Sequence, residues 1–410
     1  MKQSIGIIGG GLAGLTLAAL LGSEGMDVTC IDAAPLATQT GSSYDQRTTA
    51  ISFGSRQVME RAGVWPALAD KNAAIKTIDI LDGESTSTLN FDARDVDADA
   101  FGWIVDNADL RRALIKRVQS LKNVKHLTGV SVTGIAFSDD AAKVTLDNGK
   151  AMSFALVIGA DGRKSVLRDV MEIGTFGRDY KQSAVVCLVA HDKPHKGMAV
   201  EHFMPEGPFA LLPFTDLNGA HRSALVWTVH GTDAKRWVNC DEDIFNAALN
   251  ERSRGRYGNM RVAGKRESWP LTLAKSYSYI APRAVLVAEA AHGIHPIAGQ
   301  GLNMSLRDLA ALTDILIDAD DVGDIEILKT FQQRRRLDNL SMAFATDGLT
   351  MLFSNDRTSV KALRRIGLRA VAKLPFAKQF FMKQAMGLAS FALKPANGTD
   401  NTYSPRARRR

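Results

Sequence analysis

The sequence contains little cysteine and no long hydrophobic run, and both absences narrow the class of protein. Its three cysteines, Cys30, Cys187 and Cys240, are scattered over 410 residues without a C-x-x-C pair. This usage fits a reducing compartment and indicates neither a disulfide framework nor a metal site. No apolar run approaches the ~18 residues of a membrane span. A strand is predicted to begin at residue 4 or 5, so we expect no signal or transit peptide and a cytoplasmic location.

The net charge of +7 is concentrated toward the C-terminus. Between Lys361 and Lys394, basic residues alternate with leucine, phenylalanine and methionine, as in a basic amphipathic segment. Two interpretations stay open. The segment either lies in a membrane interface, which would make the protein peripheral on the inner membrane, or packs on the body with a solvated basic face. The terminal Arg406 to Arg410 would aid the same surface. Nucleic-acid binding has no aromatic stacking platform or recognition motif behind it.

Residues near the N-terminus form a dinucleotide-binding pattern. Ile5 to Ile8 predict a short buried strand, and GGGLAG at Gly9 to Gly14 opens a helix that runs to about Leu21. Val28 to Ile31 predict a second strand that ends on Asp32. An acidic residue about 20 positions beyond the glycines is placed to accept hydrogen bonds from ribose hydroxyls, with the pyrophosphate at the helix N-terminus. The alternative is a glycine-rich turn that binds nothing.

A second strand-turn-helix pattern lies in AVLVAEAAHGIHPIAGQGLNMSLRDL, Ala284 to Leu309. Ala284 to Ala288 predict a buried strand, and the apolar residues after Gly301 follow a helical period. Unpaired N–H groups of the first helical turn would suit the electron-rich edge of a reduced flavin. Gly299 and Gly301 would let a planar ligand lie against the backbone. A tight turn needs the same glycines, so this pattern alone leaves both interpretations open.

The chain between these patterns predicts a second, mostly antiparallel sheet. A chain of this length exceeds one ordinary core, which indicates two joined domains and a tail. The bulky, strand-like segments are Val185–Val189, Ala199–Phe203, Phe209–Pro213, Ala224–Val229 and Arg261–Leu273. Such an insertion would cover an apolar cavity. Each candidate for its lining has core packing as the alternative role: Val200, Phe203, Phe209, Leu211, Pro213 and Phe214.

Four separated motifs give the chain a resemblance to a known family. They are GGGLAG from Gly9, YDQRTTAIS from Tyr44, GADGRKSVLR from Gly159 and EAAHGIHPIAGQGLNMSLRD from Glu289. Their order and spacing over residues 4 to about 350 resemble the flavoprotein aromatic hydroxylases of the p-hydroxybenzoate-hydroxylase fold. Within these, the chain looks like the ubiquinone-biosynthesis FAD-dependent hydroxylases. HPIAGQGLN is more specific than any of the glycine motifs.

The resemblance implies an α/β fold, with a Rossmann-like FAD-binding domain, an inserted and mostly antiparallel β-sheet substrate domain, and C-terminal helices. The expected FAD-binding domain comprises residues 1–75, 106–178 and 276–350. The expected substrate domain comprises residues 76–105 and 179–275, and residues 351–410 would form the basic C-terminal helices and tail.

The resemblance also implies roles for individual residues, each on a glycine turn, a strand end or the substrate side of FAD. No metal is implied. The expected cofactor-binding residues are Gly9, Gly11, Gly14, Asp32, Arg47, Asn107, Asp161, Glu289, Gly299, Gly301, Leu302 and Asn303. Among these, Leu302 and Asn303 would offer backbone N–H groups to flavin O2 and N1. The expected catalytic residues are Arg47, Pro296, Leu302 and Asn303. Local sequence alone would make Arg47 a surface arginine and Asp161 a turn residue.

One departure from the family pattern affects the second motif. The family usually reads Gly-Asp-Ala-Ala-His where this chain has Ala288, Glu289, Ala290, Ala291 and His292. Glutamate keeps the hydrogen-bond acceptor but adds a methylene, and Ala288 adds a Cβ. We expect FAD still to bind, less tightly, with a non-binding relic as the alternative. His292 and His295 are expected to satisfy backbone groups rather than to act in catalysis.

The resemblance implies an FAD-dependent monooxygenase that hydroxylates the ring of a polyprenylated ubiquinone precursor through a flavin C4a-hydroperoxide. Its partners would be a polyprenylated phenol or quinone precursor, molecular oxygen, and transient NAD(P)H or a protein electron donor, because no second dinucleotide fingerprint is present. A membrane surface and a quinone-biosynthesis complex are further expected partners, and no nucleic acid is expected. The alternatives are a flavin-dependent isoprenoid reductase or a halogenase on the same fold, or a non-catalytic member of a quinone-biosynthesis assembly. The W-x-W-x-I-P signature of halogenases is missing.

Overall fold

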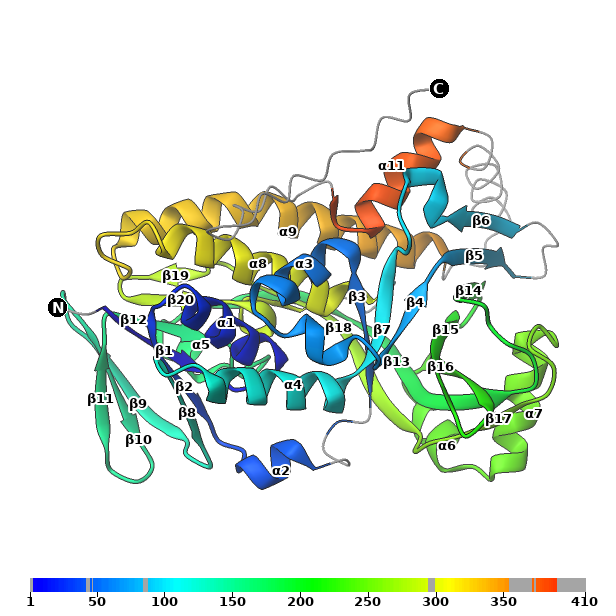
Figure 1. The fold of residues 1–410 in the computed structure, drawn as a ribbon, viewed down its shortest axis with the longest axis horizontal. Coiled ribbons are helices and arrows are strands. Elements are labelled where there is room, and N and C mark those ends of the chain that lie inside the picture. The colour runs from blue at the N-terminus through cyan, green and yellow to red at the C-terminus, as the bar shows by residue number, and fades with distance from the viewer. Residues whose placement is uncertain are drawn as a thin grey trace.

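The computed structural model describes residues 3–41, 45, 47–83, 88–293, 299–353, 371 and 374–388, with the backbone alone for residues 341–353 and 375. These residues form a mainly parallel sheet packed against helices, beside a larger and mostly antiparallel sheet (Figure 1). The predicted α/β fold class, with its nucleotide-binding part and its antiparallel insertion, is confirmed.

The six-stranded sheet is built from short, buried apolar segments. Its central strands are parallel, and only the edge strand β19 pairs in the antiparallel direction. The order across the sheet is β19 (Ile280–Ala281), β20 (Ala284–Leu286), β12 (Leu156–Gly159), β1 (Ser4–Ile8), β2 (Asp27–Asp32) and β8 (Val124–Thr128). Parallel strands buried on both faces are typically continuous apolar runs, as in β20, β12 and most of β1.

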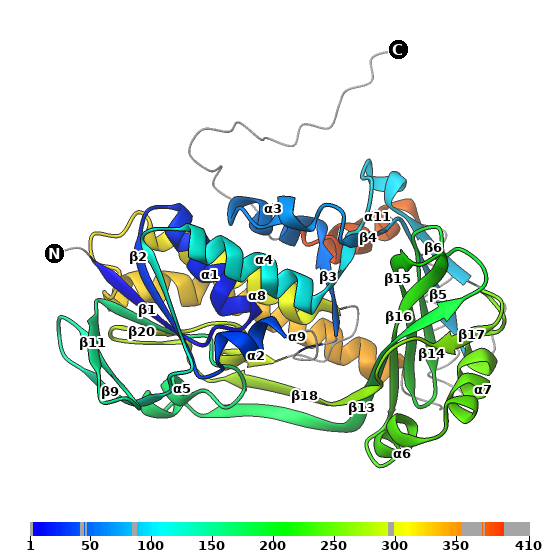
Figure 2. The same cartoon turned by 60° about the horizontal axis from the view of Figure 1, so that its bottom comes forward.

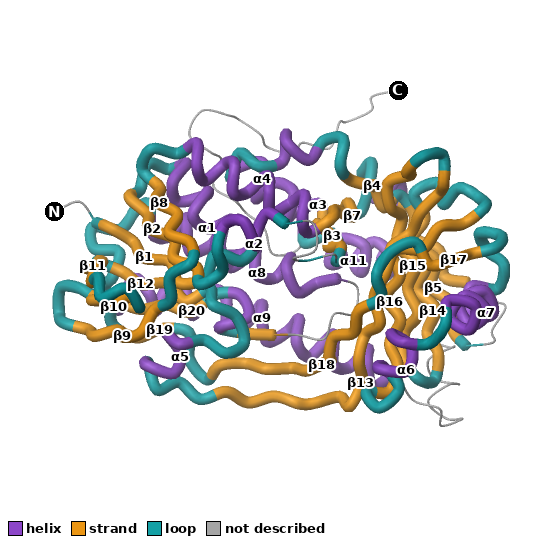
Figure 3. Tube along the Cα trace, turned by 90° about the horizontal axis from the view of Figure 1, so that it is seen from below, coloured by secondary structure: helices purple, strands orange, loops and turns teal. Residues whose placement is uncertain are grey.

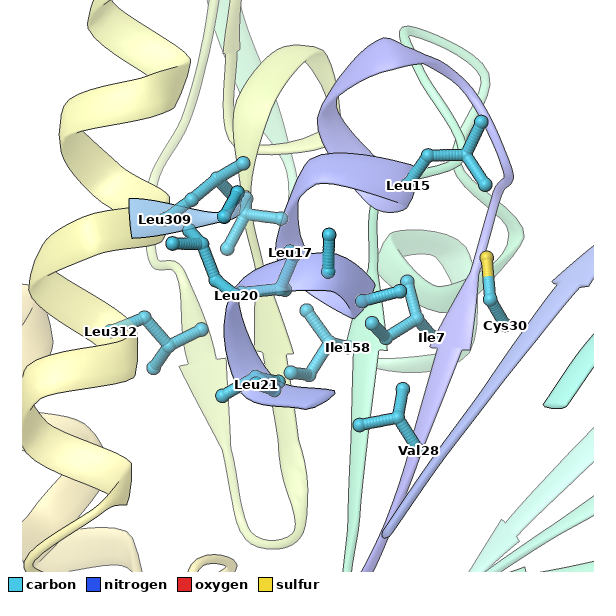
Figure 4. Packing of buried hydrophobic residues seen from close by; sticks show 14 of the residues in the cluster. Ile7, Leu15, Leu17, Leu20, Leu21, Val28, Cys30, Ile158, Leu309 and Leu312 are labelled. Carbon is cyan, nitrogen blue, oxygen red and sulfur yellow. The ribbon is translucent and has the colours of Figure 1, made fainter. Parts of the chain in front are cut away.

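A helix that packs on this sheet contacts two further helices. α1 (Leu12–Ser23) follows the first glycine turn, and it contacts both α4 (Asn107–Ser120) and α8 (Gln300–Leu316). Leu17 and Leu20 of α1 face Leu309 of α8 (Figure 4). Helices that follow the two predicted glycine turns, far apart in the sequence, thus share one core.

The larger sheet provides the second half of the molecule. Its order is β21 (His292–Gly293), β18 (Glu267–Ser276), β13 (Thr175–His191), β16 (Ala220–His230), β15 (Gly207–Leu217), β14 (Met198–Met204), β5 (Thr77–Asp82) and β6 (Thr88–Asp92), and β17 (Met260–Val262) pairs with β13. One face packs on α6 (Ala234–Asn239) and α7 (Glu242–Ser253) through Trp227, Phe209 and Phe245. The alternation of strand side chains turns the other face toward the nucleotide-binding half.

Two long strands join the halves. β13 pairs with β18 from Thr175 opposite Ser276 to Val186 opposite Glu267, with an irregularity between Asp179 and Gln182. Figures 2 and 3 show this pair running beneath the helices from one half of the molecule to the other. The two halves are therefore connected by a pair of hydrogen-bonded strands.

Smaller elements complete the described part of the chain. One three-stranded sheet contains β11 (Ala151–Phe154), β10 (Ala142–Leu146) and β9 (Val132–Phe137), and another contains β3 (Thr48–Ser52), β7 (Gly102–Asp106) and β4 (Asn72–Ile75). The remaining helical elements are α2 (Leu36–Thr40), α3 (Phe53–Arg61), η1 (Trp65–Leu68), η2 (Ala93–Val96), α5 (Val166–Val170), η3 (Ala288–Ala290), α9 (Ile325–Phe353) and α11 (Pro375–Ala385).

Two local expectations need correction. The strand expected to run to Ala288 ends at Leu286, because Ala288 has φ +53° and begins the short turn η3. The helix expected from Gly301 begins one residue earlier, at Gln300. Of the basic segment expected between Lys361 and Lys394, α11 is described, and the terminal Arg406 to Arg410 lie outside the described residues.

Candidate active site

One cavity of about 2080 Å³ lies between the two halves. Its wall includes Gly9 and Gly11 from the first glycine turn, and Gly299 and Gly301 from the second. The two turns, predicted separately from distant parts of the sequence, therefore open into the same space. From the turns the cavity continues along the inner face of the larger sheet.

Two glycines of the first turn are required by close backbone packing. Gly9 has φ +104°, and a Cβ there would lie 2.4 Å from the carbonyl oxygen of Ala160. A Cβ on Gly14 would lie 1.8 Å from the carbonyl oxygen of Gly9. Asp32, at the end of β2, accepts hydrogen bonds from the N–H groups of Gly10 (2.6 Å) and Ala34 (2.7 Å). These contacts hold the turn at the edge of the parallel sheet.

Gly11 and Gly301 lack a side chain for a different reason. A Cβ on either would meet no atom within 4 Å, and both residues line the cavity. Gly301 lies in the first turn of α8, where backbone N–H groups have no partner within the helix. The protein itself does not need glycine at these positions, whereas a flat ligand lying against both turns would. The residues present thus fit FAD, with its pyrophosphate at the first turn and its flavin at the second.

Asn303 fastens the second glycine turn to the neighbouring sheet. Its side-chain oxygen accepts from the Ser52 N–H (2.9 Å), and its amide nitrogen donates to the carbonyl oxygens of Ala50 (2.8 Å) and Gly299 (3.0 Å). The Asn303 side chain is buried, while Leu302 beside it lines the cavity. The side chain of Asn303 therefore positions the backbone of this turn.

Arg47 reaches the cavity as part of a cluster. Its guanidinium forms two 2.8 Å hydrogen bonds with Asp45 and lies 4.2 Å from the ring centroid of Trp269. Asn107 donates to Asp45 (3.0 Å) and accepts from Thr49. Burial would raise the pKa of the Asp45 carboxyl, but the hydrogen bond and charge of Arg47 hold it below its usual value. Asp45 lies in the YDQRTTAIS motif but was given no role from the sequence, and Trp269 belongs to none of the four motifs.

Asp161 and Glu289 come from two further segments that contribute to the cavity wall. Asp161 accepts from the Val166 N–H (2.8 Å) at the start of α5, and burial raises the pKa of its carboxyl. Glu289 is exposed and pairs with Arg163 at 3.2 Å. Both line the cavity. Pro296 and His295, named from the sequence, lie outside the described residues.

Ala288 is strained, which gives a stability prediction. Its φ of +53° falls in the left-handed region, which costs a residue with a Cβ ~1–2 kcal/mol. Glycine avoids that cost but gains ~0.5–1 kcal/mol of unfolded-state entropy. We expect Ala288→Gly to raise the free energy of unfolding by roughly 0.5–1 kcal/mol. Urea denaturation measures this change. The control Ala290→Gly, a buried position without positive φ, should lower stability, and a loss in both variants would contradict the strain.

A buried network of charged and polar side chains links α8, the helix that follows the second glycine turn, to α9. His292 bonds Asp308 of α8, and Asp308 also accepts from Arg335 (2.6 Å) and Asn339 (3.2 Å) of α9. Burial alone would raise the pKa of Asp308, yet His292 and Arg335 hold it well below its usual range. His292 was expected to satisfy backbone groups, but it pairs with a carboxylate instead. It does not belong to the cavity wall.

The far end of the cavity is apolar. Of the six residues predicted as lining, Val200 and Phe203 belong to its wall, whereas Phe209 and Leu211 pack beneath α7. The wall also includes Phe380 and Phe381 of α11. The remaining described residues at this end are aliphatic or aromatic for the most part: Ile78, Ile80, Leu89, Phe91, Val186, Leu188, Ala210, Leu212 and Val226. Glu201 interrupts them, and sequence patterns gave no sign of it.

Comparisons with known proteins agree with this geometry. The model of a family described as an FAD-binding domain matches residues 2–342. The chain is 36% identical over 393 residues to the ubiquinone hydroxylase UbiL of Rhodospirillum rubrum. The aligned residues cover 95% of this chain and 90% of that protein. It is 31% identical over 392 residues to the 3-demethoxyubiquinol 3-hydroxylase of Escherichia coli, covering 94% of this chain and 98% of that protein. The p-nitrophenol 4-monooxygenase PnpA of Pseudomonas putida shares the fold, with a TM-score of 0.77 at 16% identity over 94% of this chain and 98% of that one.

Proposed function

Because the chain belongs to the family of FAD-dependent hydroxylases of ubiquinone biosynthesis, we propose that it hydroxylates the aromatic ring of a polyprenylated precursor of ubiquinone. The protein is an FAD-dependent monooxygenase. The observation that supports this substrate is the single cavity that joins the nucleotide-binding turns to an apolar end formed by the larger sheet and α11. A molecule with an aromatic head and a long apolar tail would place its head beside the nucleotide-binding turns and its tail at the apolar end.

The residues of this chain would bind and orient the reactants. FAD, when bound and reduced, supplies the activated oxygen that enters the ring. The N-terminus of α8 at Gly301 and Leu302 would stabilise negative charge on the reduced flavin. Arg47, held by Asp45 and Trp269, would place a fixed positive charge at the cavity wall near the flavin. The reductant would be NAD(P)H that binds transiently or a protein electron donor.

The tail of such a substrate would come from a membrane, and α11 offers a surface for it. No helix in the described part of the chain combines the length and apolarity that a membrane crossing needs. Phe376, Phe380 and Phe381 of α11 are 84%, 53% and 50% exposed, and the latter two also line the cavity. Exposed aromatic side chains beside basic residues such as Lys383 are typical of helices that lie in a lipid interface. We propose that α11 contacts the membrane at the mouth of the cavity.

This proposal predicts a loss of vesicle binding. The triple variant Phe376→Ser, Phe380→Ser, Phe381→Ser should bind vesicles of phosphatidylethanolamine and phosphatidylglycerol at least about tenfold more weakly, because each buried aromatic ring contributes more than 1 kcal/mol. Cosedimentation with vesicles measures binding. The control Phe137→Ser removes an exposed aromatic residue from β9 and should bind as the unaltered protein does. Equal binding of all three proteins would contradict the proposed contact.

Isotope labelling tests the proposed reaction. The FAD-loaded protein is given NADH or NADPH, ¹⁸O₂ and a phenol with a short prenyl chain, and the product is analysed by mass spectrometry. We expect one ¹⁸O atom on the ring. A product with a saturated prenyl chain and no label would indicate the reductase alternative. A purified protein that cannot be reconstituted with FAD would contradict the proposal altogether.

The position of the reaction in the cell is tested separately. Deleting the gene should cause one prenylated intermediate to accumulate, and mass spectrometry of that species identifies the ring carbon that stays unhydroxylated. An unchanged quinone profile in the deletion strain would contradict a role in this biosynthesis.

A further inference from the structure

One carboxylate lies in the apolar wall of the cavity. Glu201 is on β14, and the strand register places it beside Ile80 of β5 and Ala210 of β15. The same row across the sheet continues to Leu89 on one side and to Val226 and Val186 on the other. All six residues of this row line the cavity. Glu201 is thus the one acidic residue among these six, and the next position of the row, Glu267 of β18, pairs with Lys265 at 3.2 Å.

Glu201 has no hydrogen bond or ion pair among the described residues. The neighbouring ionisable side chains have partners of their own. Asp79 pairs with Arg256, and His202 bonds the carbonyl oxygen of Gly83, both on the other face of the sheet. Lys378 of α11 pairs with Asp95 at 2.7 Å. Burial in these apolar surroundings raises the pKa of Glu201 to about 7.

The other charged residues of the described cavity wall belong to the nucleotide-binding end or to α9. They are Asp32, Asp45, Arg47, Arg111, Asp161, Arg163, Lys164, Glu289 and Asp338. None of them shifts the pKa of Glu201, for which burial is the sole cause. A carboxylate without a hydrogen-bond partner in an apolar wall lowers the stability of the folded protein. Its presence there indicates a ligand that donates a hydrogen bond to it. The hydroxyl of a phenol is such a donor.

We propose that Glu201 is the catalytic base that binds the ring hydroxyl of the substrate and accepts its proton. This inference rests on the proposed phenolic substrate. In the step, the O–H bond of the phenol breaks, the proton moves to a carboxylate oxygen of Glu201, and the electron pair remains on the substrate oxygen. The added electron density activates the ring carbons ortho and para to that oxygen toward an electrophilic oxygen. Glu201 releases the proton to solvent after the product leaves.

The pH dependence of hydroxylation gives the first test. Glu201 is ionised above its pKa, so kcat/KM of the unaltered protein should rise as the pH increases through about 7. Glu201→Gln keeps a hydrogen-bonding side chain but cannot accept the proton. We expect its kcat/KM at pH 8 to fall about 100-fold and to lose this rise. The control Glu206→Gln changes an exposed carboxylate next to the same strand and should keep both the rate and the profile.

Ligand binding gives a test that does not need turnover. Isothermal titration compares a phenol carrying a short prenyl chain with its methyl ether, which lacks the donor. The FAD-loaded unaltered protein should prefer the phenol about tenfold at pH 8, since a hydrogen bond to a charged acceptor contributes ~1.5 kcal/mol or more. Glu201→Leu should bind both ligands equally. If the role of Glu201 is only structural, Glu201→Leu should bind both ligands more weakly by the same factor. The preference for the phenol over its methyl ether would then stay unchanged.

Each outcome decides one of the two proposals. An unaltered protein that binds neither ligand contradicts the phenolic substrate, and the role of Glu201 with it. Two outcomes would overturn the role of Glu201 alone. In the first, the unaltered protein binds and hydroxylates the phenol but does not prefer it to the methyl ether. In the second, Glu201→Gln keeps the pH profile of the unaltered protein. Folding of the variant is checked by its melting temperature. Ionisation of Glu201 destabilises the native state as pH rises from 4.5 toward 7, so Glu201→Gln should melt no lower than the unaltered protein at pH 8.

Discussion

Gly301→Val should give a folded protein that fails to retain FAD. Gly301 lies in the first turn of α8, and a Cβ there meets no protein atom within 4 Å, so the substitution leaves the polypeptide unstrained. Its side chain would occupy the part of the cavity where the flavin must approach the helix N-terminus. Overpacking costs ~1–3 kcal/mol, and we therefore expect FAD affinity to fall about 100-fold at the upper end of that cost. Fluorescence titration of the apoprotein with FAD measures the dissociation constant.

The control for this variant is Gly134→Val. Gly134 lies on β9, where an added Cβ would make only an ordinary contact, 3.8 Å from the Cβ of Thr145, and the residue does not line the cavity. We expect Gly134→Val to bind FAD as the unaltered protein does. Unchanged melting temperatures of the two apoproteins would confirm that both fold. Normal FAD affinity in Gly301→Val would contradict the placement of the flavin against α8.

Asp308→Asn should cost about 3 kcal/mol of folding free energy. Asp308 is buried and shared by His292 and Arg335, and removing one member of a buried ion pair leaves an uncompensated charge, at ~3–5 kcal/mol. The lower end is expected because asparagine keeps part of the hydrogen bonding. Urea denaturation of the FAD-loaded protein measures the change. The control Glu326→Gln breaks an exposed ion pair with Lys329, both on α9, and should change the free energy of unfolding by less than about 0.5 kcal/mol.

The same network predicts a pH dependence of stability. The native pKa of Asp308 is held below the usual 3.8, so its stabilisation is present above that pH and is lost as the pH falls toward the native pKa. The free energy of unfolding of the unaltered protein should therefore decline from about pH 5 downward, more steeply than that of Asp308→Asn. Parallel acid profiles of the two proteins, or a loss below 1 kcal/mol at pH 7, would contradict the network's contribution.

Patterns whose residues all lie within about 30 positions of one another could be predicted from the sequence. The strand Ser4–Ile8, the glycine turn, α1 and Asp32 at the end of β2 follow one another along the chain, and their spacing alone indicates dinucleotide binding. The strand-turn-helix pattern before α8 was predictable for the same reason. In both places, local hydrophobic period and backbone conformation determine the structure.

Tertiary structure decided how the separate patterns meet. Asn303 bonds Ser52 across 251 positions, and the Arg47 guanidinium lies over the ring of Trp269 in the larger sheet, so neither contact follows from a local period. The sequence could not distinguish glycines required for packing, such as Gly14, from those that leave space for a ligand, such as Gly301, because both read as one letter. Only the folded backbone shows which neighbours a Cβ would meet.

The sequence by itself determined that two nucleotide-binding turns and an antiparallel insertion are present, since period, glycine spacing and strand length are local properties. The tertiary structure alone decided that both turns open into one cavity and that Glu201 faces it between aliphatic neighbours. The facing of a strand residue depends on the register of that strand with its partners, and a shift of one residue would turn Glu201 to the opposite face.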